Sequence, residues 1–324
     1  MTNQIQTVLD VNQLGKSYKT FKKAPGLMGA IKGFVNRVEI PIHAVQPTSF
    51  TIRRGEFIGL LGPNGAGKTT ILKMLTGLIP PTSGSAVAFG KYDTSARDKS
   101  YLRRIGMVMG QRNQLHADLP AMDSFHLTQA IYDIEQNRFR ERLKTCLDLF
   151  DIHEKVSVPV RKLSLGERMK MEMINAILHE PELLFLDEPT IGLDFNAAKQ
   201  IRNFLADANK KLGLTIVLTS HYTKDIEELC RRVIVINHGS MIYDGPLEGL
   251  DVRLHGERVF SLTFENSLAL NHFKARLTED SDINILNSTV ESSLDLQFAS
   301  PTRSVGRILK GLNEKINSSD IVDI

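Results

Sequence analysis

Residues 57–75, FIGLLGPNGAGKTTILKML, constrain the fold more than any other stretch of the sequence. Positions 62–69 match the pattern G-x-x-x-x-G-K-[ST], and the match stands between an apolar, strand-like run and a helix-like run, which is the context that the pattern requires. In such a loop the backbone N–H groups surround a phosphate, Lys68 reaches the β and γ phosphates, and Thr69 offers its hydroxyl to Mg²⁺. The stretch therefore predicts a nucleotide phosphate site between a strand and a helix.

The rest of the first 246 residues predicts an α/β domain. Continuous apolar runs, which are typical of strands buried on both faces of a mostly parallel sheet, occur at 57–61, 182–186, 215–219 and 233–237. Apolar residues at helical spacing occur at 70–78, 126–134, 138–150 and 197–212. The order of the strands does not follow from one sequence.

A second half of the nucleotide site is expected where LLFLDEP (183–189) places two acids at the end of an apolar strand. Asp187 at the strand end would hold Mg²⁺, usually through water, and Glu188 is placed to take a proton from the attacking water. A phosphate loop with two carboxylates is still compatible with many kinds of nucleoside triphosphatase.

Further motifs resemble those of ATP-binding cassette (ABC) proteins, in the same order along the chain. LSLGE (163–167) is similar to the family's signature sequence, usually written L-S-G-G-Q, and Gln111 in VMGQ resembles the glutamine loop. IGLD (191–194) looks like the loop that ends in an aspartate, and TSH (219–221) looks like the switch-histidine segment. Tyr18 in GKSYK stands where the family places an aromatic ring against adenine. The resemblance covers about residues 7–246, and it implies a P-loop NTPase fold with a mostly parallel core sheet and a helical subdomain.

The resemblance also implies a mechanism in which two cassettes bind ATP and Mg²⁺ between them. Each chain would offer its phosphate loop to one ATP, and it would offer Ser164 and the N–H of Gly166 to the γ-phosphate held by the other chain. The implied catalytic residues are Glu188, His221 and Gln111, and the implied metal-binding residues are Thr69, Asp187 and Gln111. The implied ATP-binding residues are Tyr18, Gly62, Pro63, Asn64, Gly65, Ala66, Gly67, Lys68, Thr69, Thr70, Ser164, Gly166 and Asp194.

Two positions depart from the signature pattern. Leu165 replaces the first glycine, and Glu167 stands where glutamine is common. Because leucine adopts a positive φ only at a cost, we expect the signature loop to lie differently over the phosphate.

The pattern changes after DGP (244–246), which suggests three parts: a nucleotide-binding domain at 1–246, a linker at 247–256 and a small domain at 257–324. The last part shows the order strand (258–264), helix (267–277), strand (283–290), strand (293–298), helix (303–315) and strand (320–324). This order predicts a small α+β domain of the ferredoxin-like type.

Charge and cysteine content bear on the partners of the chain and on the redox state of its compartment. The chain has 40 basic and 37 acidic residues, a net charge too small to predict direct binding to nucleic acid. Residues 19–42 form a basic insertion, in which five basic residues stand against Glu39. Within it the apolar positions 27, 28, 31, 34, 35 and 38 fall on one helical stripe. A helix with this stripe would either dock near the membrane or on a separate membrane permease chain, or pack on its own domain. Cys146 and Cys230 suit a reducing compartment as buried thiols.

The sequence shows neither a signal-peptide core nor an apolar run of membrane-spanning length. We therefore expect a peripheral protein at the cytoplasmic face of a bacterial inner membrane. The preferred function is the ATPase subunit of an exporter with a separate permease, in the manner of bacterial drug-, polymer- and viologen-type exporters. The alternatives are a soluble ABC ATPase that acts on nucleic acid or ribosomes, and the ATPase of an importer.

Overall fold

The computed structural model describes most of the chain, and the descriptions below refer to those parts: residues 6–21, 39–110, 113–220, 222–248, 250, 258–264, 283–286, 293–298 and 321–323. The chain forms two compact units, Met1–Leu247 and Glu248–Ile324. Most of the basic insertion, at 22–38, lies outside the described residues, so its helix stays a prediction. Among the helices that are described, none has both the length and the apolar content to cross a bilayer.

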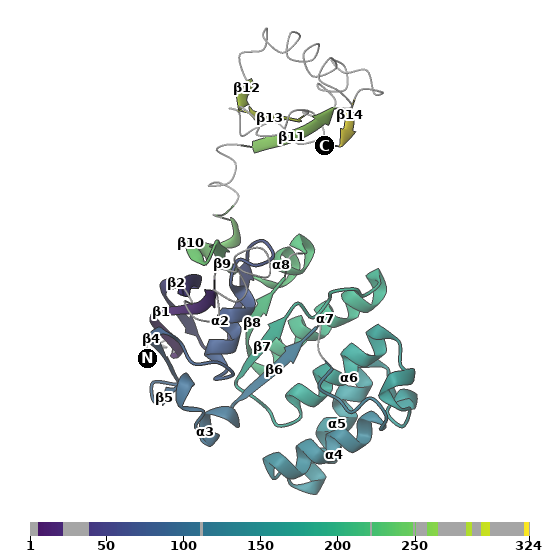
Figure 1. Cartoon of the computed structure of the whole chain (residues 1–324). Coiled ribbons are helices and arrows are strands. Elements are labelled where there is room, and N and C mark those ends of the chain that lie inside the picture. Colours follow the sequence, from purple (N-terminus) through teal and green to yellow (C-terminus); the bar gives the residue numbers. More distant parts are fainter. Residues whose placement is uncertain are drawn as a thin grey trace, which may run out of the picture. The chain divides into compact units, whose positions relative to one another are not determined.

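A six-stranded sheet forms the centre of the first unit (Figure 1), in the order β10-β9-β3-β8-β7-β6. The five strands from β9 to β6 run parallel to one another, and only β10 is antiparallel to its neighbour. This confirms the predicted mostly parallel sheet, and it supplies the strand order that the sequence left open. The bounds are β3 Phe57–Leu61, β6 Ile105–Met109, β7 Leu183–Asp187, β8 Thr215–Thr219, β9 Arg232–Asn237 and β10 Ser240–Pro246.

A four-stranded antiparallel sheet, which the sequence did not predict, belongs to the same unit, in the order β2-β1-β4-β5. Its two long strands have register shifts, for example between Val11 and Leu14 of β1. Such irregularities interrupt the alternation of buried and exposed side chains by which a strand is recognised in a sequence. The bounds are β1 Thr7–Phe21, β2 Glu39–Arg53, β4 Ser83–Ala88 and β5 Tyr92–Asp93.

Helices cover the sheets, and α4, α5 and α6 gather on one side as a helical subdomain (Figure 1). The signature segment begins α6, a helix that the sequence analysis did not name, because Met169, Met171 and Met173 alternate with polar residues as in a strand. The α-helices are α2 Lys68–Leu75, α3 Lys99–Leu102, α4 Ala121–Tyr132, α5 Gln136–Phe150, α6 Leu165–Ile177, α7 Phe195–Leu212 and α8 Thr223–Leu229. Short 3₁₀ turns are η1 Thr94–Ala96, η2 His153–Lys155 and η3 Val160–Lys162.

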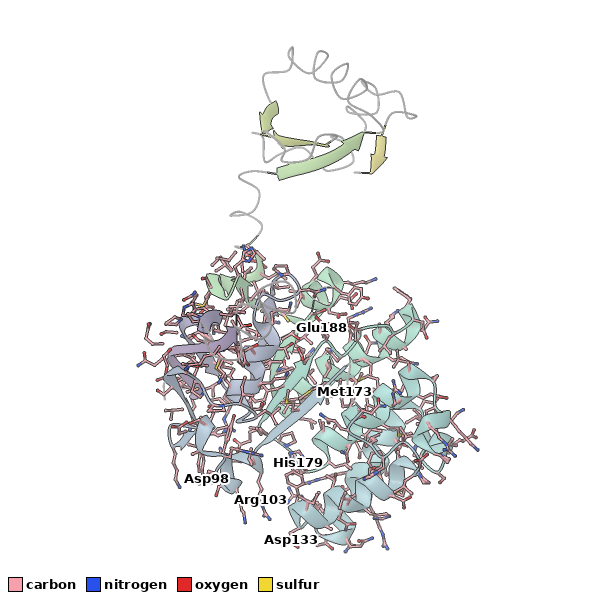
Figure 2. All side chains as sticks on the ribbon, in the orientation of Figure 1. Asp98, Arg103, Asp133, Met173, His179 and Glu188 are labelled. Carbon is pink, nitrogen blue, oxygen red and sulfur yellow. The ribbon has the colours of Figure 1, made fainter. Side chains whose placement is uncertain are left out.

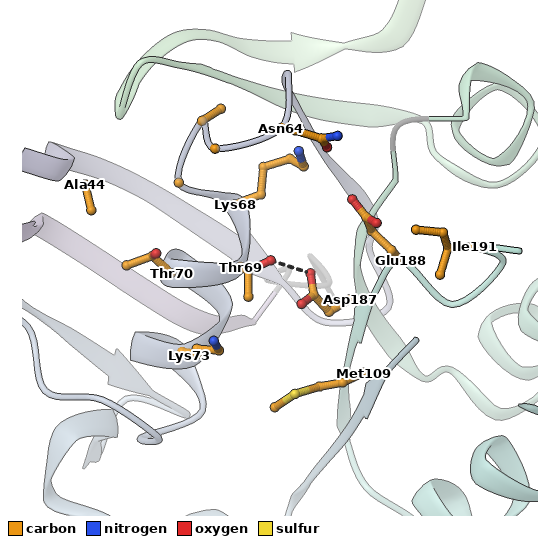
Figure 3. A pocket seen from close by; sticks show the side chains of 13 residues that line it. Ala44, Asn64, Lys68, Thr69, Thr70, Lys73, Met109, Asp187, Glu188 and Ile191 are labelled. Carbon is orange, nitrogen blue, oxygen red and sulfur yellow. Dashed lines mark hydrogen bonds between the residues drawn. The ribbon is translucent and has the colours of Figure 1, made fainter. Parts of the chain in front are cut away.

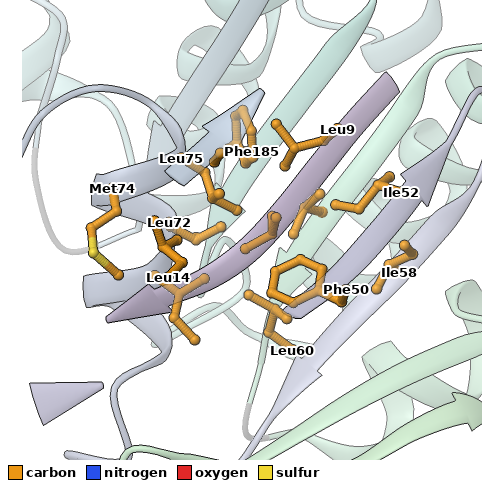
Figure 4. Close-up of a cluster of buried hydrophobic side chains, with 14 of the residues drawn as sticks. Leu9, Leu14, Phe50, Ile52, Ile58, Leu60, Leu72, Met74, Leu75 and Phe185 are labelled. Carbon is orange, nitrogen blue, oxygen red and sulfur yellow. The ribbon is translucent and has the colours of Figure 1, made fainter. Parts of the chain in front are cut away.

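The main apolar core holds α2 in place (Figure 4). Ile71, Leu72, Met74 and Leu75 of α2 are fully buried against residues of both sheets. Removing one such side chain typically costs about 2 to 5 kcal/mol of stability. The helix that follows the phosphate loop is therefore fixed by the core. Its first turn is held in one position beside the carboxyl ends of the central strands. The two cysteines are free and buried, as predicted.

The second unit contains a four-stranded antiparallel sheet in the order β12-β13-β11-β14. Its strands lie within the segments expected to be strands: β11 Arg258–Phe264, β12 Ile283–Leu286, β13 Ser293–Phe298 and β14 Ile321–Asp323. The two expected helices lie outside the described residues, so the ferredoxin-like fold stays a prediction. The finer division with a linker at 247–256 also stays a prediction.

Candidate functional site

The phosphate loop connects the end of β3 to the start of α2. Three of its glycines have positive φ angles, 147° at Gly62, 78° at Gly65 and 110° at Gly67. A Cβ at Gly62 would lie 2.0 Å from the carbonyl oxygen of Ile236, and one at Gly67 would lie 2.6 Å from that of Ala44. Both Gly62 and Gly67 therefore require glycine, because the backbone has a positive φ and a neighbouring carbonyl oxygen leaves no room for a Cβ. Gly67 is also the N-cap of α2 and has no side chain to cap it, so the first N–H groups of the helix stay available to an anion.

Lys68 is the first residue of α2, and its side chain turns back over the loop. Its Nζ donates to the carbonyl oxygens of Gly62 at 2.7 Å and Pro63 at 3.0 Å, and the residue is only 5% exposed. A buried cation held by neutral carbonyl groups gains strongly from an anion. The loop therefore combines a fixed positive charge with N–H donors.

Asp187 ends β7 beside the first turn of α2. Its Oδ1 accepts a hydrogen bond from Thr69 Oγ1 at 2.9 Å (Figure 3). It accepts a second one from Thr219 Oγ1 at 2.7 Å. Thr219 is the last residue of β8, so the ends of two neighbouring parallel strands and the start of α2 meet at one carboxylate. The two motifs that the sequence placed in one site do lie side by side.

Glu188 follows β7 in the left-handed region, with a φ of 51°. Its N–H donates to both the carbonyl oxygen and the Oγ1 of Thr219, at 3.0 and 3.1 Å. Strained backbone of this kind costs about 1 to 3 kcal/mol and persists where the surrounding structure enforces it. The side chain points into the pocket on the side opposite Lys68 (Figure 3), at the edge of the sheet where β7 ends (Figure 2).

A pocket of about 500 Å³ opens between these residues. Its lining includes the predicted Asn64, Gly65, Ala66, Gly67, Lys68, Thr69, Thr70, Asp187 and Glu188, together with four residues that the sequence analysis missed: Ala44, Lys73, Met109 and Ile191. Lys73 lies four residues after Thr69 on α2, so helical periodicity could have indicated it. Ala44 comes from the antiparallel sheet, and no sequence pattern pointed to it.

Tyr18 does not line the described pocket, but its partner in the neighbouring strand stands close in sequence to the pocket residue Ala44. It is paired with Ile42 of β2, two residues before Ala44, and the residue is 45% exposed. Lys16 Nζ lies 5.4 Å from the centre of that ring. An exposed ring on this strand pair is free to stack on a planar group, and adenine stacking by Tyr18 stays a prediction.

Ser164 is the N-cap of α6 and forms a capping box with Glu167. Ser164 Oγ accepts from the Glu167 N–H at 3.2 Å, and Glu167 Oε2 accepts from the Ser164 N–H at 2.8 Å. Lys155 Nζ lies 3.0 Å from Glu167 Oε1. These contacts, above all the hydrogen bond from the Ser164 backbone, hold the pKa of Glu167 below its ordinary value. An acid at this position therefore serves the start of the helix.

Leu165 is the first helical residue of α6 and its φ is not positive, so the backbone here accepts a leucine without strain. How the signature loop lies over the phosphate stays a prediction. Gly166 packs so closely on α7 that a Cβ there would lie 2.7 Å from Ala197 Cβ. Asp194 caps α7 by accepting from the Ala197 N–H at 2.9 Å. Ser164, Gly166 and Asp194 share this separate region and do not line the described pocket.

Glu172 connects α6 to the segment that follows Gln111. It is 3% exposed, and its Oε1 accepts from the N–H groups of Gln114 at 2.8 Å and Leu115 at 3.2 Å. Burial raises its pKa. Gln111 and His221 themselves lie outside the described residues, so their roles stay predictions.

Comparison with known proteins shows the family to which the chain belongs. A family model described as ABC transporter matches residues 45–191. The ABC transporter ATP-binding protein NatA of Bacillus subtilis (strain 168) is 32% identical over 209 residues, which cover 64% of this chain and 84% of NatA. The chain belongs to the ABC transporter family. The linearmycin resistance ATP-binding protein LnrL of the same organism is 34% identical over 222 residues, 68% of this chain and 70% of LnrL.

Solved structures agree on the fold of this ABC subunit. The dimeric, post-hydrolysis structure of the ATP-binding cassette MJ0796 with bound ADP and Pi matches with a TM-score of 0.60 at 22% identity, over 74% of this chain and 98% of that one. The predicted P-loop NTPase cassette is therefore confirmed. The chain is an ABC ATP-binding subunit, and its activity is ATP hydrolysis coupled to transport.

Proposed function

We propose that this ABC subunit powers export through a separate membrane permease, and that two copies hydrolyse two ATP molecules at shared sites. The observation that supports the hydrolytic part most directly is the convergence of Lys68, Thr69, Asp187 and Glu188 on one pocket. This arrangement combines a charge for the phosphates, oxygen ligands for a cation and a carboxylate for the attacking water.

The donor set at this pocket fits Mg²⁺, which prefers oxygen ligands. The Thr69 hydroxyl directs its proton to Asp187, so its lone pairs stay available to a cation, and Asp187 would hold the ion through water. When bound, Mg²⁺ would neutralise charge that develops on the transferred phosphoryl group.

Hydrolysis would proceed by attack of water on the γ-phosphorus, with ADP as the leaving group. Glu188 accepts a proton from that water as the new P–O bond forms. Lys68 and the N–H groups at the start of α2 stabilise the negative charge on the phosphate oxygens. His221 and Gln111 are proposed to contribute to the same site.

The second half of each site would come from a second copy of the chain. Ser164 and Gly166 lie apart from the pocket of their own chain, at the start of α6, where helical N–H groups favour an anion. In the proposed dimer they contact the γ-phosphate of the ATP held by the partner, and Asp194 lies at the same interface. Loss of the γ-phosphate then weakens the interface, so the two chains separate. This separation drives the permease.

Export is favoured over import because LnrL is named for resistance to linearmycin. The proposed location is the cytoplasmic face of the membrane, on the permease. The family model and the two relatives named above do not favour the alternative of an ATPase that acts on nucleic acid or ribosomes.

A mixed dimer tests the shared sites. Ser164→Arg in one chain should inactivate the site whose phosphate loop lies on the other chain, so a dimer of Ser164→Arg with Lys68→Ala should keep one intact site. Purified mixed dimers with about half of wild-type turnover support sharing, and full turnover by a strictly monomeric wild-type protein contradicts it. The genes beside that of the chain test the direction: permease genes alone support export, and an added binding-protein gene contradicts it.

A further inference from the structure

A buried carboxylate next to the pocket is not used by the proposed mechanism. Asp225 of α8 is 1% exposed. Its Oδ2 accepts hydrogen bonds from Thr190 Oγ1 at 2.5 Å and from Ser220 Oγ at 2.9 Å, and its Oδ1 accepts from Arg202 of α7 at 3.0 Å. Hydrogen bonds to an ionised acceptor are stronger than those between neutral groups, and in a buried site they are screened little by water.

The Ser220 contact acts on the segment that follows β8. While its hydroxyl donates to Asp225, Ser220 Oγ accepts from the N–H of Tyr222 at 3.0 Å. Ser220 and Tyr222 stand on either side of position 221 in the chain. The carboxylate thus fixes the backbone on both sides of that position through one serine hydroxyl.

The Thr190 contact acts on the segment that follows β7. Thr190 is 4% exposed and comes two residues after Glu188. The N–H of Ile191 donates to the carbonyl oxygen of Glu188 at 3.2 Å, which makes a tight turn there. Because Glu188 has a left-handed backbone, its side-chain direction depends on how this turn is held.

Arg202 compensates the charge of Asp225. It is 4% exposed and also donates through Nε to Glu228 Oε2 at 2.6 Å. Arg202 therefore has two carboxylate partners on α8. Among the described residues, Asp225 also bonds to the segments that follow β7 and β8, whereas Glu228 does not. This difference provides a matched pair of acids for an experiment.

We propose that Asp225 is a positioning residue for ATP hydrolysis, which joins the turn after Glu188 to Ser220 and Tyr222. The inference rests on the proposed role of Glu188. Thr190 and Ser220 follow the ends of neighbouring parallel strands, so a shift of one would be transmitted to the other through the carboxylate of Asp225. The side chain of Glu188 would keep its direction only while Thr190, Ser220 and Asp225 stay connected.

A double-mutant cycle on turnover tests this coupling in the full chain. Thr190→Val and Ser220→Ala each remove one hydroxyl, and each should lower kcat by about 3- to 10-fold while the KM for ATP changes by less than about 2-fold. If Asp225 couples the segments, the double variant should stay within about 2-fold of the slower single variant. Effects that multiply would overturn the proposal.

Asp225→Asn and Glu228→Gln separate positioning from mere pairing of Arg202. Asp225→Asn should lower kcat at least as far as the slower single variant, and Glu228→Gln should leave kcat unchanged. Turnover is divided by the number of ATP-binding sites titrated in each sample, which removes the contribution of misfolded protein. Equal losses in the two variants would contradict the proposal, and if Asp225→Asn does not fold, the cycle still decides. Glu188→Gln is measured in parallel: retained turnover there rejects the role of Glu188 independently of the cycle.

Discussion

The hydroxyl of Thr69 donates a hydrogen bond to Asp187 over 2.9 Å, which joins two residues that are 118 positions apart. One belongs to the first turn of α2, the other to the last position of β7. The bond directs the lone pairs of Thr69 away from Asp187, as a hydroxyl that also binds a cation requires.

Thr69→Val tests this arrangement, because valine keeps the shape and removes the oxygen. We expect ATPase activity to fall by about 10-fold or more and the Mg²⁺ concentration for half-maximal activity to rise. A Mg²⁺ titration of turnover measures both, with the exposed Thr145→Val as the control. An unchanged Mg²⁺ dependence would contradict the ligand role.

Glu188→Gln tests the proposed base. The amide keeps the shape but cannot accept a proton, so turnover should fall by about 10² or more while ATP still binds. The variant should accumulate as an ATP-bound dimer, which size-exclusion chromatography with ATP detects. Glu154→Gln on the surface should behave as wild type, and wild-type turnover in Glu188→Gln would reject the role.

Gly166→Ala tests the packing of α6 on α7. The new methyl group would lie 2.7 Å from Ala197 Cβ, and overpacking of this kind typically costs about 1 to 3 kcal/mol. Ala197→Gly in the same chain removes the opposing methyl group and should restore part of that loss. Chemical denaturation of the wild type, Gly166→Ala and the double variant measures the change in the free energy of unfolding. If the second change gives no recovery, the contact is not the cause.

Glu167→Gln tests the ion pair at the start of α6. The amide oxygen can still complete the capping box, so the variant loses mainly the Lys155 pair, worth about 1 kcal/mol or less because Lys155 is half exposed. The pKa of Glu167 is lowered in the folded state, so its contribution is present above the ordinary value of 4.5 and is lost as pH falls through the folded-state pKa.

The stability difference between wild type and Glu167→Gln should therefore be largest near neutral pH and disappear in acid. Urea unfolding at a series of pH values measures it. A difference that grows as the pH falls would contradict the assigned direction.

Much of this site followed from short stretches of sequence, because the chemistry depends there on local backbone geometry. The positive φ angles of the phosphate loop, the position of Lys68 at a helix start and the two consecutive acids at the end of β7 and directly after it are all properties of a few consecutive residues. The order of the strands was not predictable, since parallel pairing joins segments that are far apart in the chain. The antiparallel sheet was missed because its register shifts disturb the period of two.

The strand, phosphate loop and helix, and the two acids at the end of a second strand, were predictable from the sequence alone. Which other groups meet them depends on the folded chain: Ala44 and Met109 in the pocket, Thr219 on Asp187, and Asp225 between the segments that follow β7 and β8. Local motifs fix conformation over a few residues, whereas these contacts form between distant segments that the buried core brings together.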